Sequence, residues 1–187
     1  MAIGLSRNWL FASFISVATG IGALSAPARA EDDTSSLKGK PAPAFPPRGQ
    51  WLNSKPITWA DFRGKVVIVD FFADWCGPCR NDYPALVQMN KDRENSGIYI
   101  LGIHTPGSGK EAIEKLMKDY SITYPVFVDV PAPPGVQSWG TVYSAFGVTA
   151  IPHSFLIDPN GQVVSHGMLG EIVGKARELR NKTKKAG

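Results

Sequence analysis

The chain has 187 residues, of which 43% are hydrophobic, and a formal net charge of +4 at pH 7. This length fits a single domain with a short extension, and the hydrophobic fraction excludes an intrinsically disordered protein. Two of the positive charges lie in residues 1–30, so the rest of the chain carries only +2. A body so close to neutrality argues against nucleic acid as a partner.

The first 30 residues have the pattern of an export signal. Arg7 supplies positive charge, residues 9–24 are an uncharged apolar run, and Ala28 and Ala30 form the small-residue pattern of a signal-peptidase site. The run of 16 apolar residues is short for a membrane-spanning helix, which needs about 20. We therefore expect residues 1–30 to be a signal peptide of an exported, periplasmic protein that is soluble after cleavage. An uncleaved membrane anchor is the alternative.

Two regions are predicted to follow the signal. Residues 31–50 are polar and then rich in proline, which is typical of a linker. Residues 51–187 are predicted to form the folded domain. Within it, residues 51–64 have the pattern of an edge strand followed by a short element.

The most apolar stretch of the domain is "KVVIVDFFA" at residues 65–73. It is rich in β-branched and aromatic residues on both faces, with Asp70 as the exception, and this predicts a buried central strand. Residues 80–95 have helical spacing of apolar side chains, and residues 97–105 have the pattern of another strand.

Helix and strand patterns continue to alternate in the second half of the chain. They predict a helix over 109–120, a strand over 124–129, a short helix over 141–148, a strand–turn–strand over 153–168 and a last helix from about Glu171. Residues 130–140, "VPAPPGVQSWG", form a proline-rich insertion, and such loops often carry specificity. Within it, Trp139 is expected either to touch a partner or to pack the loop onto the body.

The only two cysteines, Cys76 and Cys79, lie in the pentapeptide "WCGPC" between the predicted strand and helix. A disulfide between them closes so short a loop that it removes little entropy from the unfolded chain, and it would be a poor structural staple. A zinc site would need a second C-x-x-C or a close His pair, and the sequence contains neither. The pair is therefore predicted to be a dithiol whose opening and closing is its function, with no cofactor or resident metal.

The position of the pair predicts different roles for its two thiols. Cys76 is expected on the first turn of a helix, where free backbone N–H groups and the helix dipole favour a thiolate. A fall in thiol pKa from about 8.5 to about 7 needs about 2 kcal/mol of differential stabilisation. Cys76 is thus predicted to attack, and Cys79 to resolve the mixed disulfide. Gly77 leaves room for the incoming partner, and Pro78 lacks an N–H that would be unpaired at a helix start.

The segment "VDFFADWCGPCRNDYPAL" at 69–86 resembles the active-site segment of the thioredoxin superfamily. Its "CRNDYPAL" continuation and the exported setting resemble the TlpA/ResA-like periplasmic thiol–disulfide oxidoreductases, and the resemblance runs from about Phe62 to Arg180. It implies a thioredoxin-like α/β fold of three layers over 51–187, with a central mixed sheet flanked by helices. It also implies an enzyme, a thiol–disulfide oxidoreductase that reduces disulfides in partner proteins. Gly-Pro is the dipeptide of thioredoxin, a reductant whose potential is about −270 mV, against about −120 mV for the oxidant DsbA.

The resemblance implies roles for residues around the dithiol. The superfamily places a cis-proline at Ile151-Pro152, packed against the cysteines and offering backbone groups to an extended partner. Asp70 matches a buried Asp that helps take the proton from the second cysteine through water, and a strand-end carboxylate is the alternative. Asp82 competes for that role, although relatives usually have Glu there, and a solvated helix residue is the alternative. Trp75 is expected to cover the dithiol and shape the partner groove.

The implied partners are protein disulfide substrates and a membrane electron donor of the DsbD/CcdA type, because a glutathione pool cannot recharge a periplasmic reductant. The resemblance suggests cytochrome c maturation or delivery of reductant to a metal-site assembly factor.

Two other classes of protein remain open. A Sco-like copper-binding protein would combine the cysteines with a histidine such as His104 or His153, although Sco-like proteins carry C-x-x-x-C. A peroxidase of the peroxiredoxin type expects Thr three residues before its cysteine, where this chain has Ala73.

Overall fold

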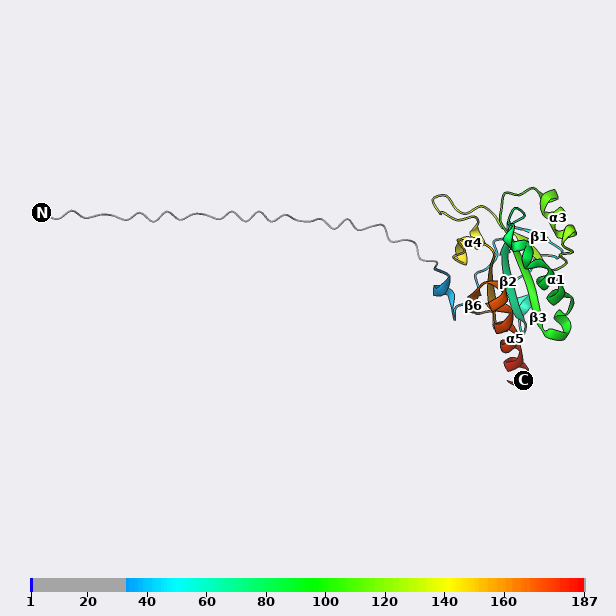
Figure 1. The fold of residues 1–187 in the computed structure, drawn as a ribbon. Helices are drawn as coiled ribbons and strands as arrows, with labels where there is room; N and C mark the ends of the chain where they lie inside the picture. Colours follow the sequence, from blue (N-terminus) through cyan, green and yellow to red (C-terminus); the bar gives the residue numbers. More distant parts are fainter. Residues whose placement is uncertain (2–32, 187) are drawn as a thin grey trace.

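A six-stranded mixed sheet organises the fold (Figure 1). The computed structural model describes Met1 and residues 33–186, so the predicted signal at 1–30 lies, apart from Met1, outside the described residues. In the order in which they lie side by side, the strands are β1 (Gln50–Leu52), β4 (Val126–Val128), β3 (Ile98–His104), β2 (Val66–Phe72), β5 (His153–Ile157) and β6 (Val163–Gly167). The central strands β4, β3 and β2 are parallel, and the outer strands are antiparallel to their neighbours.

Helices cover both faces of the sheet (Figure 1). The α-helices are α1 (Tyr83–Lys91), α2 (Arg93–Ser96), α3 (Lys110–Asp119), α4 (Thr141–Ala145) and α5 (Leu169–Ala186), and the 3-10 helices are η1 (Asp33–Leu37), η2 (Trp59–Phe62) and η3 (Pro78–Asn81). The core on one face contains side chains of α1, α3 and α5, and the core on the other face contains side chains of α4 and η2. The predicted three-layer α/β fold is confirmed. Among the described residues, no helix combines the length and the apolar character that a membrane span requires.

Strand β2 is the centre of the molecule because every one of its residues is buried. Its side chains alternate between the two cores: Ile68 and Phe72 lie on the α1 and α5 face, and Val69 and Phe71 on the α4 face. Asp70 therefore points to the same face as Ile68 and Phe72. The chain leaves the carboxyl end of β2 directly into the cysteine segment, so a fully buried strand positions the thiols.

The single helix expected over 80–95 is divided into η3, α1 and α2. Pro84 explains the first break, because proline lacks an N–H and its ring clashes with the carbonyl four residues earlier. An α-helix cannot run through that position from η3, so α1 begins with Pro84 in its first turn. Gly97, with φ of 68°, then ends α2 in the left-handed conformation.

The described part of the predicted linker, from residue 33 to residue 50, is packed against the domain. The N–H of Gly39 donates to the carbonyl of Val163 at 2.8 Å, and the N–H of Ala42 donates to the carbonyl of Gly161 at 2.9 Å. The ring of Phe45 packs against several aromatic rings of the body. This stretch therefore adds to the core on the α4 face, through contacts that a proline-rich composition does not reveal.

A buried carboxylate fixes the insertion 130–140 to the body. Asp129 is only 4% exposed. It accepts hydrogen bonds from the backbone N–H groups of Val130, Val142 and Tyr143 at 2.8, 2.8 and 3.1 Å. The same side chain thus holds the start of the insertion and satisfies free N–H groups at the start of α4.

Replacement of this carboxylate should weaken the fold. We expect Asp129→Ala to lower the free energy of unfolding by about 2 kcal/mol, because a helix cap is lost and buried N–H groups lose their acceptor. Denaturant unfolding followed by circular dichroism measures the change. Asp119→Ala is the matched control, since Asp119 forms an exposed ion pair on α3 that contributes at most about 1 kcal/mol. Equal losses in the two variants would contradict this role of Asp129.

Candidate active site

Cys76 and Cys79 form a disulfide in the segment that joins β2 to α1. Cys76 is 3% exposed and Cys79 is 1% exposed, so both cysteines are buried in this oxidised state. Gly77 and Pro78, between them, are exposed, and Trp75 is 60% exposed. A reacting partner therefore reaches deeply set sulfurs past a short exposed loop and one large aromatic ring.

The local backbone differs from the predicted helix start. Cys76 precedes η3 and does not lie on the first turn of an α-helix, so that expectation is wrong. Pro84 delays the α-helix to residue 83, as described above. An N–H group still points at the sulfur, because the backbone N–H of Cys79 donates to Sγ of Cys76 at 3.3 Å. In the reduced protein such a donor favours the thiolate form of Cys76.

The peptide bond between Ile151 and Pro152 is cis, as expected. Both residues are half-buried, and they directly precede β5. Ile151 packs against the core cluster that contains both cysteines. The structure thus brings the cis-proline segment and the dithiol to the same region, although they are far apart in sequence.

Asp70 is 1% exposed and lies in the interior of β2, which excludes a strand-end position. The hydroxyl of Ser154, opposite it on β5, donates to its carboxyl group at 3.0 Å. Burial raises the pKa of Asp70 to about 8, the hydrogen bond from Ser154 lowers it, and the nearby charge of Asp82 raises it further. Sequence reasoning missed Ser154, whose only signal is a small polar residue inside the apolar strand "HSFLI".

Asp82 lies at the junction of η3 and α1 and is half-buried. Its Oδ2 atom is buried without a hydrogen-bond partner, and burial raises its pKa. The hydroxyls of Tyr83 and Tyr124 are also buried without a partner, and the charge of Asp70 acts on both. The structure therefore gathers three more polar groups around Asp70. Tyr83 and Tyr124 were not expected from the sequence, because only the order of the strands brings residue 124 to this face.

Both ring nitrogens of His104 are bonded to the backbone. His104 is fully buried: its Nε2 accepts the N–H of Asp74 at 2.9 Å, and its Nδ1 donates to the carbonyl of Thr105 at 2.7 Å. Burial lowers the pKa of His104, in keeping with a neutral ring. With both ring nitrogens bonded to the backbone, His104 is not available to a metal.

His153 lies on the other face of the sheet from the dithiol. Ser154 points to Asp70, so the preceding side chain points the opposite way. There the ring of His153 stacks on that of His166 with centroids 5.3 Å apart, and the two rings approach at 3.2 Å between Nε2 and Nδ1. Within residues 33–186, no group of three or more His, Cys, Asp or Glu side chains is placed to hold a metal ion. The Sco-like alternative therefore has no histidine beside the sulfurs.

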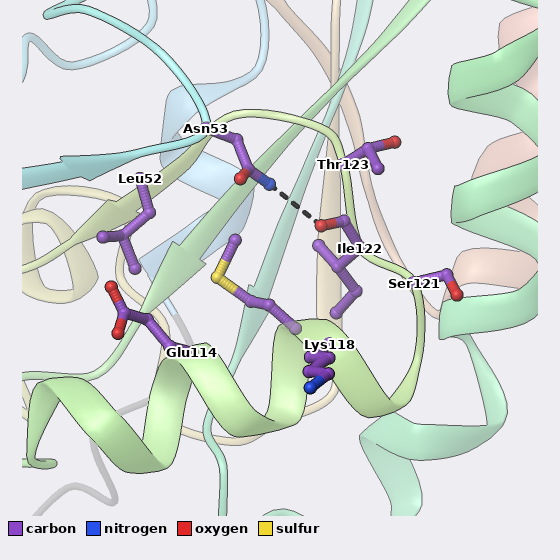
Figure 2. Close-up of a pocket in the computed structure, with 8 residues that line it drawn as sticks. Leu52, Asn53, Glu114, Lys118, Ser121, Ile122 and Thr123 are labelled. Atoms are coloured by element: carbon purple, nitrogen blue, oxygen red, sulfur yellow. Dashed lines mark hydrogen bonds between the residues drawn. The ribbon is translucent and has the colours of Figure 1, made fainter.

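A separate cavity of about 480 Å³ lies between β1 and α3 (Figure 2). Leu52 and Asn53 line it from the strand side, and Glu114 and Lys118 from the helix side. The amide of Asn53 donates to the carbonyl of Ile122 at 2.9 Å, which ties the two walls together. None of the expected site residues lines this cavity, so the redox site does not extend into it.

Residues 38–166, more than two thirds of the chain, match the AhpC/TSA family. The chain belongs to the AhpC/TSA family. It is similar to the thiol-disulfide oxidoreductase ResA of Bacillus subtilis (strain 168), with 32% identity over 60% of this chain and 58% of the relative. ResA of Bacillus thuringiensis subsp. konkukian is 30% identical over 67% of this chain and 66% of the relative. The chain thus spans less than two thirds of the length of these curated relatives.

Solved structures give the same relationship. A thioredoxin-like superfamily protein has a TM-score of 0.62 and 26% identity, covering 75% of this chain and 96% of that one. The thioredoxin domain of a thiol-disulfide oxidoreductase from Bacteroides vulgatus has a TM-score of 0.60 and 25% identity, covering 79% and 96%. The resemblance to the thioredoxin superfamily and its ResA-like members is confirmed, and so is the thioredoxin-like fold.

The raised pKa of Asp70 should couple stability to pH. Well below the ordinary pKa of 3.8 the carboxyl group is protonated in both states, and as the pH rises from there towards about 8 only the unfolded state loses the proton. The unfolding free energy of the oxidised protein should therefore fall across this window, by about 4 kcal/mol at pH 7. Asp70→Asn should flatten the fall, as measured by denaturant unfolding at several pH values.

The exposed Asp119→Asn is the control and should keep the wild-type pH dependence. Parallel profiles for wild type and Asp70→Asn would show that Asp70 ionises normally in the folded protein.

Proposed function

We propose that this protein is an exported thiol–disulfide oxidoreductase that reduces disulfides in partner proteins through Cys76 and Cys79. The observation that carries the proposal is the Cys76–Cys79 disulfide, which follows the exposed Trp75 in a ResA-like chain whose buried Asp70 points to the same face of the sheet. Two cysteines that pair with each other, together with a buried acid on the same face, can store two electrons and exchange a proton.

The first step joins the substrate to Cys76 through a mixed disulfide. In the reduced protein, the thiolate of Cys76 attacks one sulfur of the substrate disulfide. The substrate S–S bond breaks, a mixed disulfide forms between Cys76 and the substrate, and the leaving thiolate takes a proton from solvent. The N–H of Cys79, aimed at Sγ of Cys76, stabilises the attacking anion.

The second step releases the substrate. Asp70 takes the proton of Cys79, and the resulting thiolate attacks Sγ of Cys76. The Cys76–Cys79 disulfide forms as the bond between Cys76 and the substrate breaks, and the second substrate sulfur leaves as a thiolate that takes up the proton held by Asp70. A pKa of about 8 suits Asp70 to this step, because a carboxyl group with such a pKa can both accept and return a proton near neutral pH.

Each turnover moves two electrons from the dithiol to the substrate, so the disulfide must be reduced again. For an exported protein, whose predicted signal occupies residues 1–30, we propose a membrane electron donor of the DsbD/CcdA type. The same reasoning favours apocytochrome c or a metal-site assembly factor as the substrate. Similarity to ResA supports the thiol chemistry, and the export signal supports the compartment.

The alternatives receive less support from the geometry. A copper-binding protein lacks its histidine, since His104 is bonded to the backbone and His153 faces away from the sulfurs. A peroxidase would use a Thr hydroxyl at position 73, where this chain has a fully buried Ala73.

Variants of the two cysteines test the proposed order of events. The reduced protein without residues 1–30 should catalyse the reduction of insulin by dithiothreitol. Cys76→Ser should abolish turnover to the uncatalysed rate. Cys79→Ser should accumulate a covalent mixed disulfide that thiol reagents release, because the resolving thiol is gone. Ser144→Ala, on the exposed surface of α4, is the control and should turn over normally. Stoichiometric copper binding without dithiol turnover would overturn the proposal.

A further inference from the structure

Large apolar side chains are exposed next to the dithiol. Trp75, adjacent to Cys76, is 60% exposed, and Trp139 is 39% exposed. Their rings meet edge to face with centroids 5.9 Å apart, although Trp139 belongs to the insertion 130–140. Val136, in the same insertion, is 43% exposed. Exposed aromatic side chains that gather in one place mark a binding surface more often than single exposed apolar residues do.

The insertion holds Trp139 in a fixed position. The N–H of Thr141 donates to the carbonyl of Val130 at 2.9 Å, and its hydroxyl donates to the carbonyl of Pro131 at 3.0 Å. The ring of Trp139 also packs edge to face on the buried Tyr143, with centroids 5.7 Å apart. The indole is thus held by Tyr143 and Trp75 while part of it remains exposed to solvent, which is the arrangement of a preorganised contact.

A pocket of about 360 Å³ lies beside this ring. Its lining residues are Gln137, Ser138, Trp139, Val148 and Thr149. They come from the insertion and from the segment that leads into the cis-proline. No ionisable side chain lines the pocket, so it offers no counter-charge to a charged group and favours a neutral one. Its volume is at the lower end for ligand pockets, in keeping with one large side chain.

The depth of the sulfurs restricts the kind of partner. Because Cys76 is only 3% exposed, a rigid folded surface cannot bring a disulfide to it without colliding with the loop around Gly77 and with Trp75. An extended segment can reach it, since a single strand of polypeptide projects its side chains alternately to either side. Such a segment, lying with its cysteine at Cys76, passes the Trp75–Trp139 pair.

We propose that the pocket beside Trp139 is a substrate subsite that binds a large, uncharged apolar side chain flanking the disulfide cysteine of an extended polypeptide. This inference rests on the proposed disulfide reduction and names its substrate class. Trp139 is then a specificity-determining residue supplied by the insertion, and its ring contact with Trp75 links the subsite to the segment that carries Cys76.

Peptide substrates test the inference directly. A set of short disulfide-bonded peptides differs only in whether one position beside the cysteine holds Phe, Ser or Lys, with each flanking position tried in turn. For wild type, kcat/KM should be about 10-fold higher for Phe than for Ser at the best position, and lowest for Lys. The preference should reside mainly in KM, since the subsite binds a group remote from the reacting sulfurs.

Variants of the insertion separate the subsite from general effects. Trp139→Ala should reduce the Phe preference to about 2-fold or less, and Trp139→Phe should restore most of it. Val136→Ala is the matched control, because it removes exposed apolar surface from the same loop, and it should keep the wild-type preference. Melting temperatures of all variants report on folding.

Oxidised 2-mercaptoethanol, a small disulfide without amino-acid side chains, distinguishes a failure of the subsite from a failure of disulfide reduction itself. Val136→Ala, whose side chain does not line the pocket, should reduce it at the wild-type rate, and the rate of each variant on this disulfide is the reference for its Phe preference. No Phe preference in wild type, an unchanged preference in Trp139→Ala, or an equal loss on every substrate would overturn the subsite while leaving disulfide reduction intact. If wild type reduced neither the peptides nor the small disulfide, the proposed function itself would fail.

Discussion

The burial of the Asp70 carboxyl group inside β2 is the constraint on which the site depends. Every residue of that strand is buried, and one hydroxyl, that of Ser154, is the hydrogen-bond partner of the carboxyl group. Because desolvation penalises the charged form, the pKa of Asp70 rises to about 8, where the carboxyl group can accept and return a proton in the proposed mechanism. The same burial makes the folded state less stable as the pH rises. The pH dependence of stability and the proposed proton transfer therefore depend on the same residue, Asp70.

Local sequence patterns predicted the strands, the hairpin and the cysteine motif, because these depend mainly on residues close together in the chain. The run of residues 65–73 gave a buried strand, the hairpin over 153–168 formed, and the motif around Cys76 identified the superfamily. The direction of His153 could not be read from its position after a proline, because the pleat of β5 decides which face each side chain takes. The buried hydroxyl of Tyr124 was equally hidden, since it depends on which strands are neighbours in the sheet.

The reactive groups and the insertion 130–140 belong to different parts of the fold. The thiols and the carboxyl group are positioned by β2 and its neighbours, where any change in packing is felt throughout the core. The insertion 130–140, in contrast, touches the dithiol region through one aromatic ring and is attached to the body by Asp129. Its composition can therefore change without moving the sulfurs, which is how a common redox core acquires different partners.

The attachment of the N-terminal segment has a consequence for how the protein is held in its surroundings. Gly39 and Ala42 bond to the start of β6, and the register across β5 places that end of the sheet beside Val67, near the beginning of β2. The sulfurs follow the other end of β2, about 20 Å away along the strand. A force on the chain ahead of Gly39 would therefore be borne first by these hydrogen bonds, at the end of the sheet away from the sulfurs, and not by the reactive segment.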